Sequence, residues 1–130
     1  MTISNSISET TLSAGINHNA EMIKAFYTDI IFDKGDISAQ SIVAPVSIAK
    51  RVTAAKTRTD NNIVFSARIN PGDLSETTVI KGVWLSGTTP DGTEIFLVKH
   101  VIPDTVVNSV QGLLYEVPYA VTGYSESYEE

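Results

Sequence analysis

The sequence predicts a mainly β protein, an antiparallel β-sandwich of about six strands with an N-terminal helix. Three observations lead to this prediction. Segments rich in Val, Ile, Thr and aromatic residues recur along the chain, and turn-forming residues separate them. Strands do not alternate with helices in the way that parallel sheets require. Only the first part of the chain carries apolar residues at helical spacing.

Residues 1–24 are predicted to form a loose arm followed by a helix. Ser6 and Glu9 stand at the spacing of a capping box, in which each side chain would bind a backbone N–H of the first turn. An apolar stripe with steps of three and four residues follows, made of Leu12, Ile16, Ala20 and Ile23. We therefore expect a helix from about Ser8 to Lys24.

Residues 25–122 are predicted to form the sandwich. A first strand, aromatic and β-branched, covers residues 25–32. Residues 46–55 and 63–69 alternate apolar and polar side chains on either side of a polar turn, which predicts a hairpin with one buried face. The segment 37–45 between these strands has no clear periodicity.

The strongest β-hairpin signal joins Val79–Leu85 to Glu94–Ile102. Pro90, Asp91 and Gly92 supply the turn chemistry between these two runs. Apolar residues occupy both faces of both arms, so both faces require cover from a second sheet, a helix or another subunit. We therefore predict a cyclic homo-oligomer with this hairpin near the subunit contact.

The last strand of the sandwich is expected at Gly112–Val121. One face of this strand carries every second residue, namely Leu113, Tyr115, Val117, Tyr119 and Val121. Pro118 lies on the opposite phase and lacks a backbone donor, so this strand should lie at a sheet edge or a bulge. Residues 123–130 contain Tyr124, Tyr128 and three glutamates, and we expect a frayed acidic tail.

The composition of the chain argues against several classes of function. The chain has 130 residues, of which 42% are hydrophobic and 18% charged, which is enough apolar material for one domain with one core. Its net charge of −6 argues against nucleic acid or an anionic membrane as the main partner. The lack of cysteine excludes disulfides and thiolate chemistry. No apolar run reaches the length of a membrane span, and the first residues lack the pattern of a secretory signal.

No catalytic or metal-binding motif stands out in the sequence. His18 and His100 lie far apart, and neither has other metal-ligating residues at the usual spacing, so each is expected to be a structural or surface histidine. No serine occupies a nucleophile-elbow motif, and no glycine motif predicts a phosphate loop. We therefore predict a protein without cofactor, metal ion or enzymatic activity; an enzyme would require a pocket with perturbed carboxylates.

Large apolar side chains are the candidate interface residues, because buried aromatics usually anchor cores or interfaces. The predicted oligomer or partner interface consists of Trp84, Phe96, Val98, Ile102, Tyr115 and Tyr119. The alternative is a carbohydrate-binding, lectin-like module in which Trp84 or the tyrosines stack on sugar rings, and this alternative requires exposed aromatic side chains on one surface. A further group of basic residues is expected to be solvated or to face a partner: Lys50, Arg51, Lys56 and Arg58.

Several short motifs follow one another in a characteristic order. An aromatic strand leads into an acidic Gly turn at Phe26–Asp36, and a basic hairpin follows at Ile48–Ile69. The run Ile80-Lys81-Gly82-Val83-Trp84-Leu85 then leads to the turn Asp91-Gly92, and a return strand carries Pro103, Gly112 and Tyr115–Val117. This order resembles the N-terminal domains of bacteriophage tail-fibre, tail-collar and related virion attachment proteins.

The resemblance implies a non-enzymatic structural or attachment protein of a phage virion, made in the host cytoplasm. Its implied partners are copies of itself, with a trimer favoured, and other virion proteins, with a host-surface glycan as a further candidate. Lys81 stands where that family usually has an acidic residue. No fibre shaft follows the domain, so the resemblance favours a small head, neck, tail or baseplate component.

Overall fold

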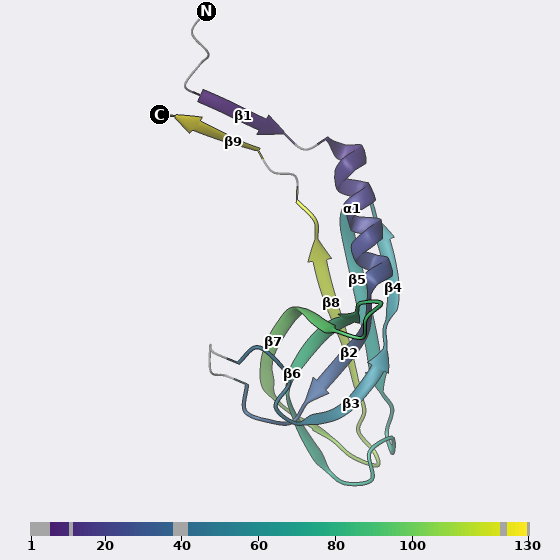
Figure 1. The fold of residues 1–130 in the computed structure, drawn as a ribbon. Helices are drawn as coiled ribbons and strands as arrows, with labels where there is room; N and C mark the ends of the chain where they lie inside the picture. The colour runs from purple at the N-terminus through teal and green to yellow at the C-terminus, as the bar shows by residue number, and fades with distance from the viewer. Residues whose placement is uncertain (1–5, 11, 38–41, 123–124, 130) are drawn as a thin grey trace, which may run out of the picture.

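The computed structural model describes residues 6–10, 12–37, 42–122 and 125–129. Its fold is mainly β with one helix near the N-terminus, as the sequence predicts (Figure 1). The elements are β1 (Ser6–Thr10), α1 (Ser13–Phe26), β2 (Tyr27–Asp33), β3 (Ile48–Thr53), β4 (Ala55–Thr59), β5 (Asn62–Ile69), β6 (Thr78–Thr88), β7 (Glu94–Val107), β8 (Leu113–Ala120) and β9 (Ser125–Glu129).

The strands form three antiparallel sheets. A four-stranded sheet has the order β3-β2-β6-β7, a three-stranded sheet has the order β4-β5-β8, and β1 pairs with β9 alone. The predicted β6–β7 hairpin is confirmed, with Gly82 opposite Val101 and a positive φ of 91° at Gly92 in its turn. Pro118 lies on β8 at an edge of its sheet, as a proline without a backbone donor requires.

The main core lies between the four-stranded and three-stranded sheets. Every second residue of β5 is buried, and these side chains (Ile63, Phe65, Ala67 and Ile69) meet Ile30, Phe32, Val83 and Leu85 from the other sheet. Helix α1 extends the same core through Ala20, which is fully buried, and Ile23, which is half-buried. The sandwich therefore forms from the clean alternation that the sequence shows in β5.

The predicted hairpin between residues 46–55 and 63–69 is wrong in its pairing. The first segment divides at Ala54: β3 pairs with β2 in one sheet, whereas β4 pairs with β5 in the other. Ala54 is buried and its N–H donates to the carbonyl of Thr28 at 2.8 Å. The chain thus turns a corner of the sandwich at this small residue and joins the two sheets.

Two predictions about the chain ends are also wrong. Helix α1 begins at Ser13, and its N-cap residue, Leu12, makes no side-chain capping bond. The helix ends at Phe26, so β2 starts only at Tyr27. Ser6 and Glu9 lie in β1 instead of a capping box, and β9 replaces the expected frayed tail. A capping box contributes about 1 kcal/mol, and pairing of the two chain ends satisfies more backbone groups than that cap would.

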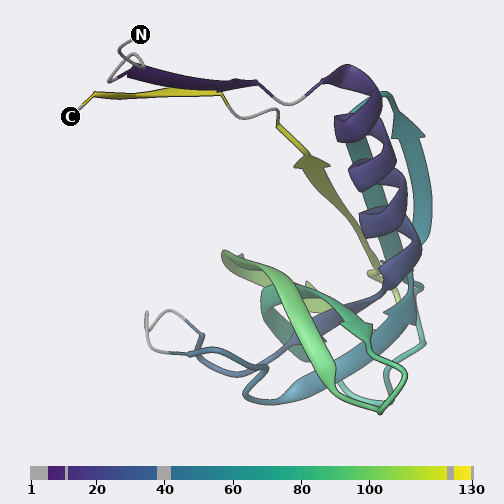
Figure 2. The ribbon, with the colours of Figure 1, turned by 45° about the horizontal axis from the view of Figure 1, so that its top comes forward.

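Strand β7 continues past Pro103 to Val107. The β1–β9 ribbon, by contrast, stands away from the sandwich in both views (Figures 1 and 2). Within the described residues, no helix is long and apolar enough to cross a membrane.

Candidate functional site on the outer face and the terminal ribbon

The outer face of the four-stranded sheet is covered near Trp84 by the chain between β2 and β3. We call residues 34–37 and 42–47 the cover segment. Ile37 and Ile42 from this segment pack on Ile31 and Trp84, forming a second, smaller apolar cluster outside the main core. Ile37 sits directly above Gly82, where a Cβ atom would lie only 1.8 Å from its terminal carbon. Glycine at this position therefore makes room for the cover segment.

A single buried carboxylate attaches the cover segment to the sheet. Asp33 is fully buried and accepts backbone hydrogen bonds from Gly35 at 2.8 Å, Val46 at 2.8 Å and Ser47 at 3.0 Å. The same carboxylate accepts a hydrogen bond from the indole N–H of Trp84 at 3.1 Å. Four donors satisfy its charge, so Asp33 is a structural anchor between sheet and segment.

The six predicted interface residues do not form one surface. Trp84 is only 2% exposed, and Phe96 packs edge-on against it with ring centroids 5.4 Å apart. The other four, Val98, Ile102, Tyr115 and Tyr119, are half-buried against the main core. Trp84 is therefore a core residue of this chain, and as such it cannot offer the exposed stacking surface of a lectin.

The second face of the hairpin does not need a second subunit around Trp84, because the cover segment of the same chain packs there. Residues 37–45 show no periodicity, so their sequence gives no sign of this cover. Ile95 and Val101 on β7 are more exposed than the predicted interface residues, at 40% and 55%.

The two histidines are placed apart, as their sequence positions suggest. His18 is exposed on α1. His100 on β7 forms a 2.8 Å hydrogen bond between its Nδ1 and the Tyr115 hydroxyl of β8, so it links the two sheets of the sandwich. Among the residues that the structure describes, no three of His, Asp or Glu gather in a way that could hold a metal ion.

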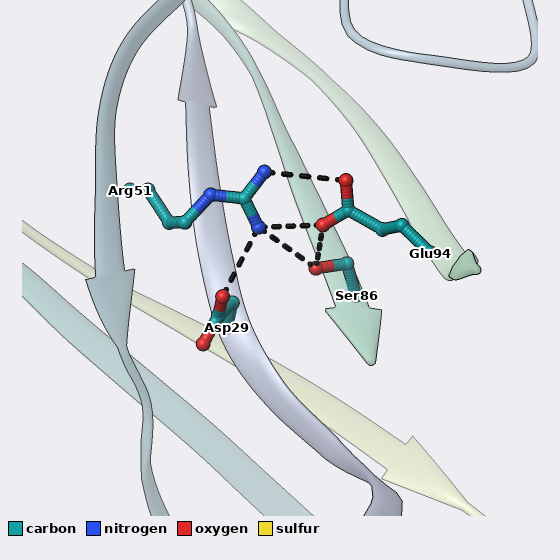
Figure 3. Close-up of polar contacts among 4 residues, drawn as sticks. All are labelled: Asp29, Arg51, Ser86 and Glu94. Atoms are coloured by element: carbon teal, nitrogen blue, oxygen red, sulfur yellow. Dashed lines mark hydrogen bonds and ion pairs between the residues drawn. The ribbon is translucent and has the colours of Figure 1, made fainter. Parts of the chain in front are cut away.

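A charged cluster of Asp29, Arg51, Ser86 and Glu94 lies on the four-stranded sheet (Figure 3). Arg51 of β3 donates to Glu94 of β7 through both terminal nitrogens, at 2.5 and 3.2 Å. It also donates to Asp29 of β2 at 3.0 Å and to Ser86 of β6 at 3.4 Å. The Ser86 hydroxyl donates to Glu94 at 2.7 Å. One guanidinium thus connects all four strands of the sheet.

The electrostatics of this cluster favour its charged form. The hydrogen bond from Arg51 is the main cause that lowers the pKa of Glu94 below its ordinary value, and burial opposes it. Reciprocally, the hydrogen bond to Glu94 raises the pKa of Arg51. The Ser86 hydroxyl donates to a carboxylate, and the contacts described here do not form a Ser-His pair that would activate it as a nucleophile. The cluster therefore stabilises the sheet rather than resembling a catalytic site.

Arg51 belongs to the predicted basic group, but its partners Asp29, Ser86 and Glu94 were not predicted. These residues are 22, 35 and 43 positions away from Arg51, and only strand register brings them together: Asp29 lies opposite Ser86. The four residues of the predicted basic group also separate. Lys50 and Arg51 lie on β3, whereas Lys56 and Arg58 lie on β4 in the other sheet.

The terminal ribbon is the second candidate feature. In β1 and β9, Ile7 lies opposite Tyr128 and Glu9 lies opposite Glu126. An isolated two-stranded ribbon is marginally stable in water at best. The ribbon therefore has the properties of an element that gains stability from a partner.

Comparisons with protein-family models, with curated proteins and with solved structures found no match for this chain.

Proposed function

We propose that this protein is a non-enzymatic structural component of a bacteriophage virion, which acts through contacts with copies of itself and with other virion proteins. The β1–β9 ribbon carries the proposal. It joins both ends of the described chain, lies outside the sandwich (Figure 2) and leaves the edges of both strands open. Exposed strand edges are the usual templates for pairing with another chain.

The resemblance in motif order to phage attachment domains supports the virion context, and a cyclic oligomer, with a trimer favoured, follows from the same resemblance. The placement of Trp84 inside the protomer moves the expected contact away from the β6–β7 hairpin. The ribbon supplies the contact surface instead. The sandwich then serves as the body of the protein that carries the ribbon.

Mass spectrometry of purified phage particles from the source of this sequence tests the proposal. We expect peptides of this chain in intact particles, at several copies per particle, and their retention after particles are re-purified through a density gradient. Peptides found only in the lysate, and never with particles, would contradict a role in the virion.

A further inference from the structure

The outer face of the three-stranded sheet is not covered by any other part of the described chain. In β5 the odd-numbered residues point into the core, beginning with Ile63 and Phe65, so the even-numbered residues point outward. Strand register places the even-numbered residues of β8 and the odd-numbered residues of β4 on the same outer face. All of these outward residues are exposed or half-buried, and none belongs to either apolar cluster.

Small, uncharged side chains form most of this outer face. Strand β4 contributes Ala55, Thr57 and Thr59, and the centre of β5 contributes Val64 and Ser66. None of the outward residues of the three strands is aromatic, so the face offers no ring that could stack on a sugar. Such a face allows a second sheet to approach to the spacing of about 10 Å that stacked sheets adopt.

Two charged side chains lie on the same face, Arg68 of β5 and Glu116 of β8. Arg68 lies opposite Leu114 and Ser66 lies opposite Glu116, so the two charged residues are diagonal neighbours. Both are exposed, and neither forms an ion pair with any residue that the structure describes. The other two arginines of the chain each contact a carboxylate. This cation and this anion therefore remain available to a partner.

A face with one positive and one negative charge fits a second copy of itself. In a contact about a two-fold axis, a residue of one copy meets a second residue of the other copy, and the reverse contact forms as well. Arg68 of each copy can then meet Glu116 of the other, which forms two ion pairs and leaves neither charge alone. The same contact would bury Leu114, which is 53% exposed in the single chain.

We propose that two copies of this protein pack back to back through the outer faces of their three-stranded sheets, with reciprocal Arg68–Glu116 ion pairs across a two-fold axis. The inference goes beyond the proposed function, because this contact uses neither the terminal ribbon nor another virion protein. The face measures roughly 25 by 15 Å, from the length of β5 and the spacing of three strands. An interface of this size belongs to the small, weak class, so the dimer should form at micromolar concentrations or above.

Charge reversal tests this contact by light scattering coupled to size-exclusion chromatography, over loading concentrations from about 1 µM to about 1 mM. The wild-type protein should approach twice its mass of 14.0 kDa as the concentration rises. Arg68→Glu gives a face with two carboxylates, and Glu116→Arg gives a face with two guanidinium groups. In each single variant the two-fold contact brings like charges together, so we expect the Kd of the dimer to rise by about tenfold or more.

Combining the two reversals makes the test specific to this pair of residues. An equimolar mixture of the two single variants should associate, because opposite charges then meet at both contacts. The double variant, which exchanges the two charges, should recover most of the wild-type affinity.

Glu76→Arg is the matched control, because it makes the same charge change at an exposed position between β5 and β6, beside Ala49 of the other sheet. It should leave the Kd of the dimer unchanged. Unaltered thermal unfolding and Trp84 emission will verify that each variant is folded.

The outcomes separate this inference from the proposed function. A wild-type protein that stays monomeric up to about 1 mM overturns the contact, and so does an oligomer whose Kd changes in neither single variant. Failure of the mixed single variants to associate, while the wild type dimerises, would overturn the pairing of Arg68 with Glu116. None of these results bears on the presence of the chain in phage particles, which mass spectrometry decides separately.

Discussion

Asp29 and Asp33 lie four residues apart on β2 but have different surroundings. Asp33 is fully buried and accepts hydrogen bonds from three backbone N–H groups and an indole. The Asp29 side chain is 25% exposed and accepts from Arg51, which has Glu94 as a second partner. The Asp33 carboxylate links the cover segment to Trp84 through hydrogen bonds to both, whereas Asp29 is one of several acceptors that Arg51 contacts.

The contribution of a carboxylate to the stability of the fold therefore depends on its burial and on the number of hydrogen-bond donors that it satisfies. Removal of a buried acceptor leaves every donor that it satisfied without a hydrogen-bond partner. Removal of a half-exposed partner lets water take its place, and exposed ion pairs contribute only about 0–1 kcal/mol. The expected effects of mutations on this face therefore span a wide range.

Asp33→Ala should have the largest effect. We expect a loss of about 3 kcal/mol in the free energy of unfolding, because the buried indole N–H and the backbone donors of the cover segment lose their acceptor. Trp84 is the only tryptophan, so its emission reports on the cover directly and should shift to the red with easier quenching by acrylamide. Asp104→Ala, at an exposed position of β7, is the control and should change stability by less than about 0.5 kcal/mol. An unchanged Trp84 emission in Asp33→Ala would contradict the anchoring role.

Gly82→Ala should have an intermediate effect, since the new methyl group would overlap the side chain of Ile37. We expect a loss of about 1–3 kcal/mol, as for other overpacked sites, measured by urea unfolding. Ile37→Ala alone should cost about 2–5 kcal/mol through the cavity that it leaves. In the double variant the methyl group fills part of that cavity, so the combined loss should be clearly smaller than the sum. Simple additivity would show that the two residues do not meet.

Glu94→Gln should have the smallest effect, about 0.5–1 kcal/mol near neutral pH, because the cluster is partly exposed. The pKa of Glu94 is lowered in the folded protein from its ordinary value of 4.5. Its stabilising contribution is therefore fully present above that value and is lost as the pH falls through the lowered folded pKa. Unfolding curves of wild type and variant should differ at pH 7 and converge in acid. A difference that grows on acidification would contradict the pairing with Arg51.

Local sequence patterns predicted the elements whose neighbours lie close in the chain. Alternation identified the buried face of β5, and Pro90, Asp91 and Gly92 identified the β6–β7 turn. The apolar pattern of residues 46–59 does not reveal that they belong to two sheets, because β3 and β4 are both strands. The change of sheet occurs at an ordinary small residue, Ala54. Sequence also could not pair β1 with β9, whose strands are more than a hundred residues apart.

The amino-acid sequence alone determined the mainly β fold, the N-terminal helix and the apolar character of both faces of the β6–β7 hairpin, since these follow from spacing and turn chemistry. Only the tertiary structure decided what covers the second face. Ile37 belongs to a segment without periodicity, and its place above Gly82 depends on register and on the hydrogen bonds of Asp33. Likewise, Asp29, Arg51, Ser86 and Glu94 form a cluster because four strands align them, and strand alignment is a long-range property that no local pattern encodes.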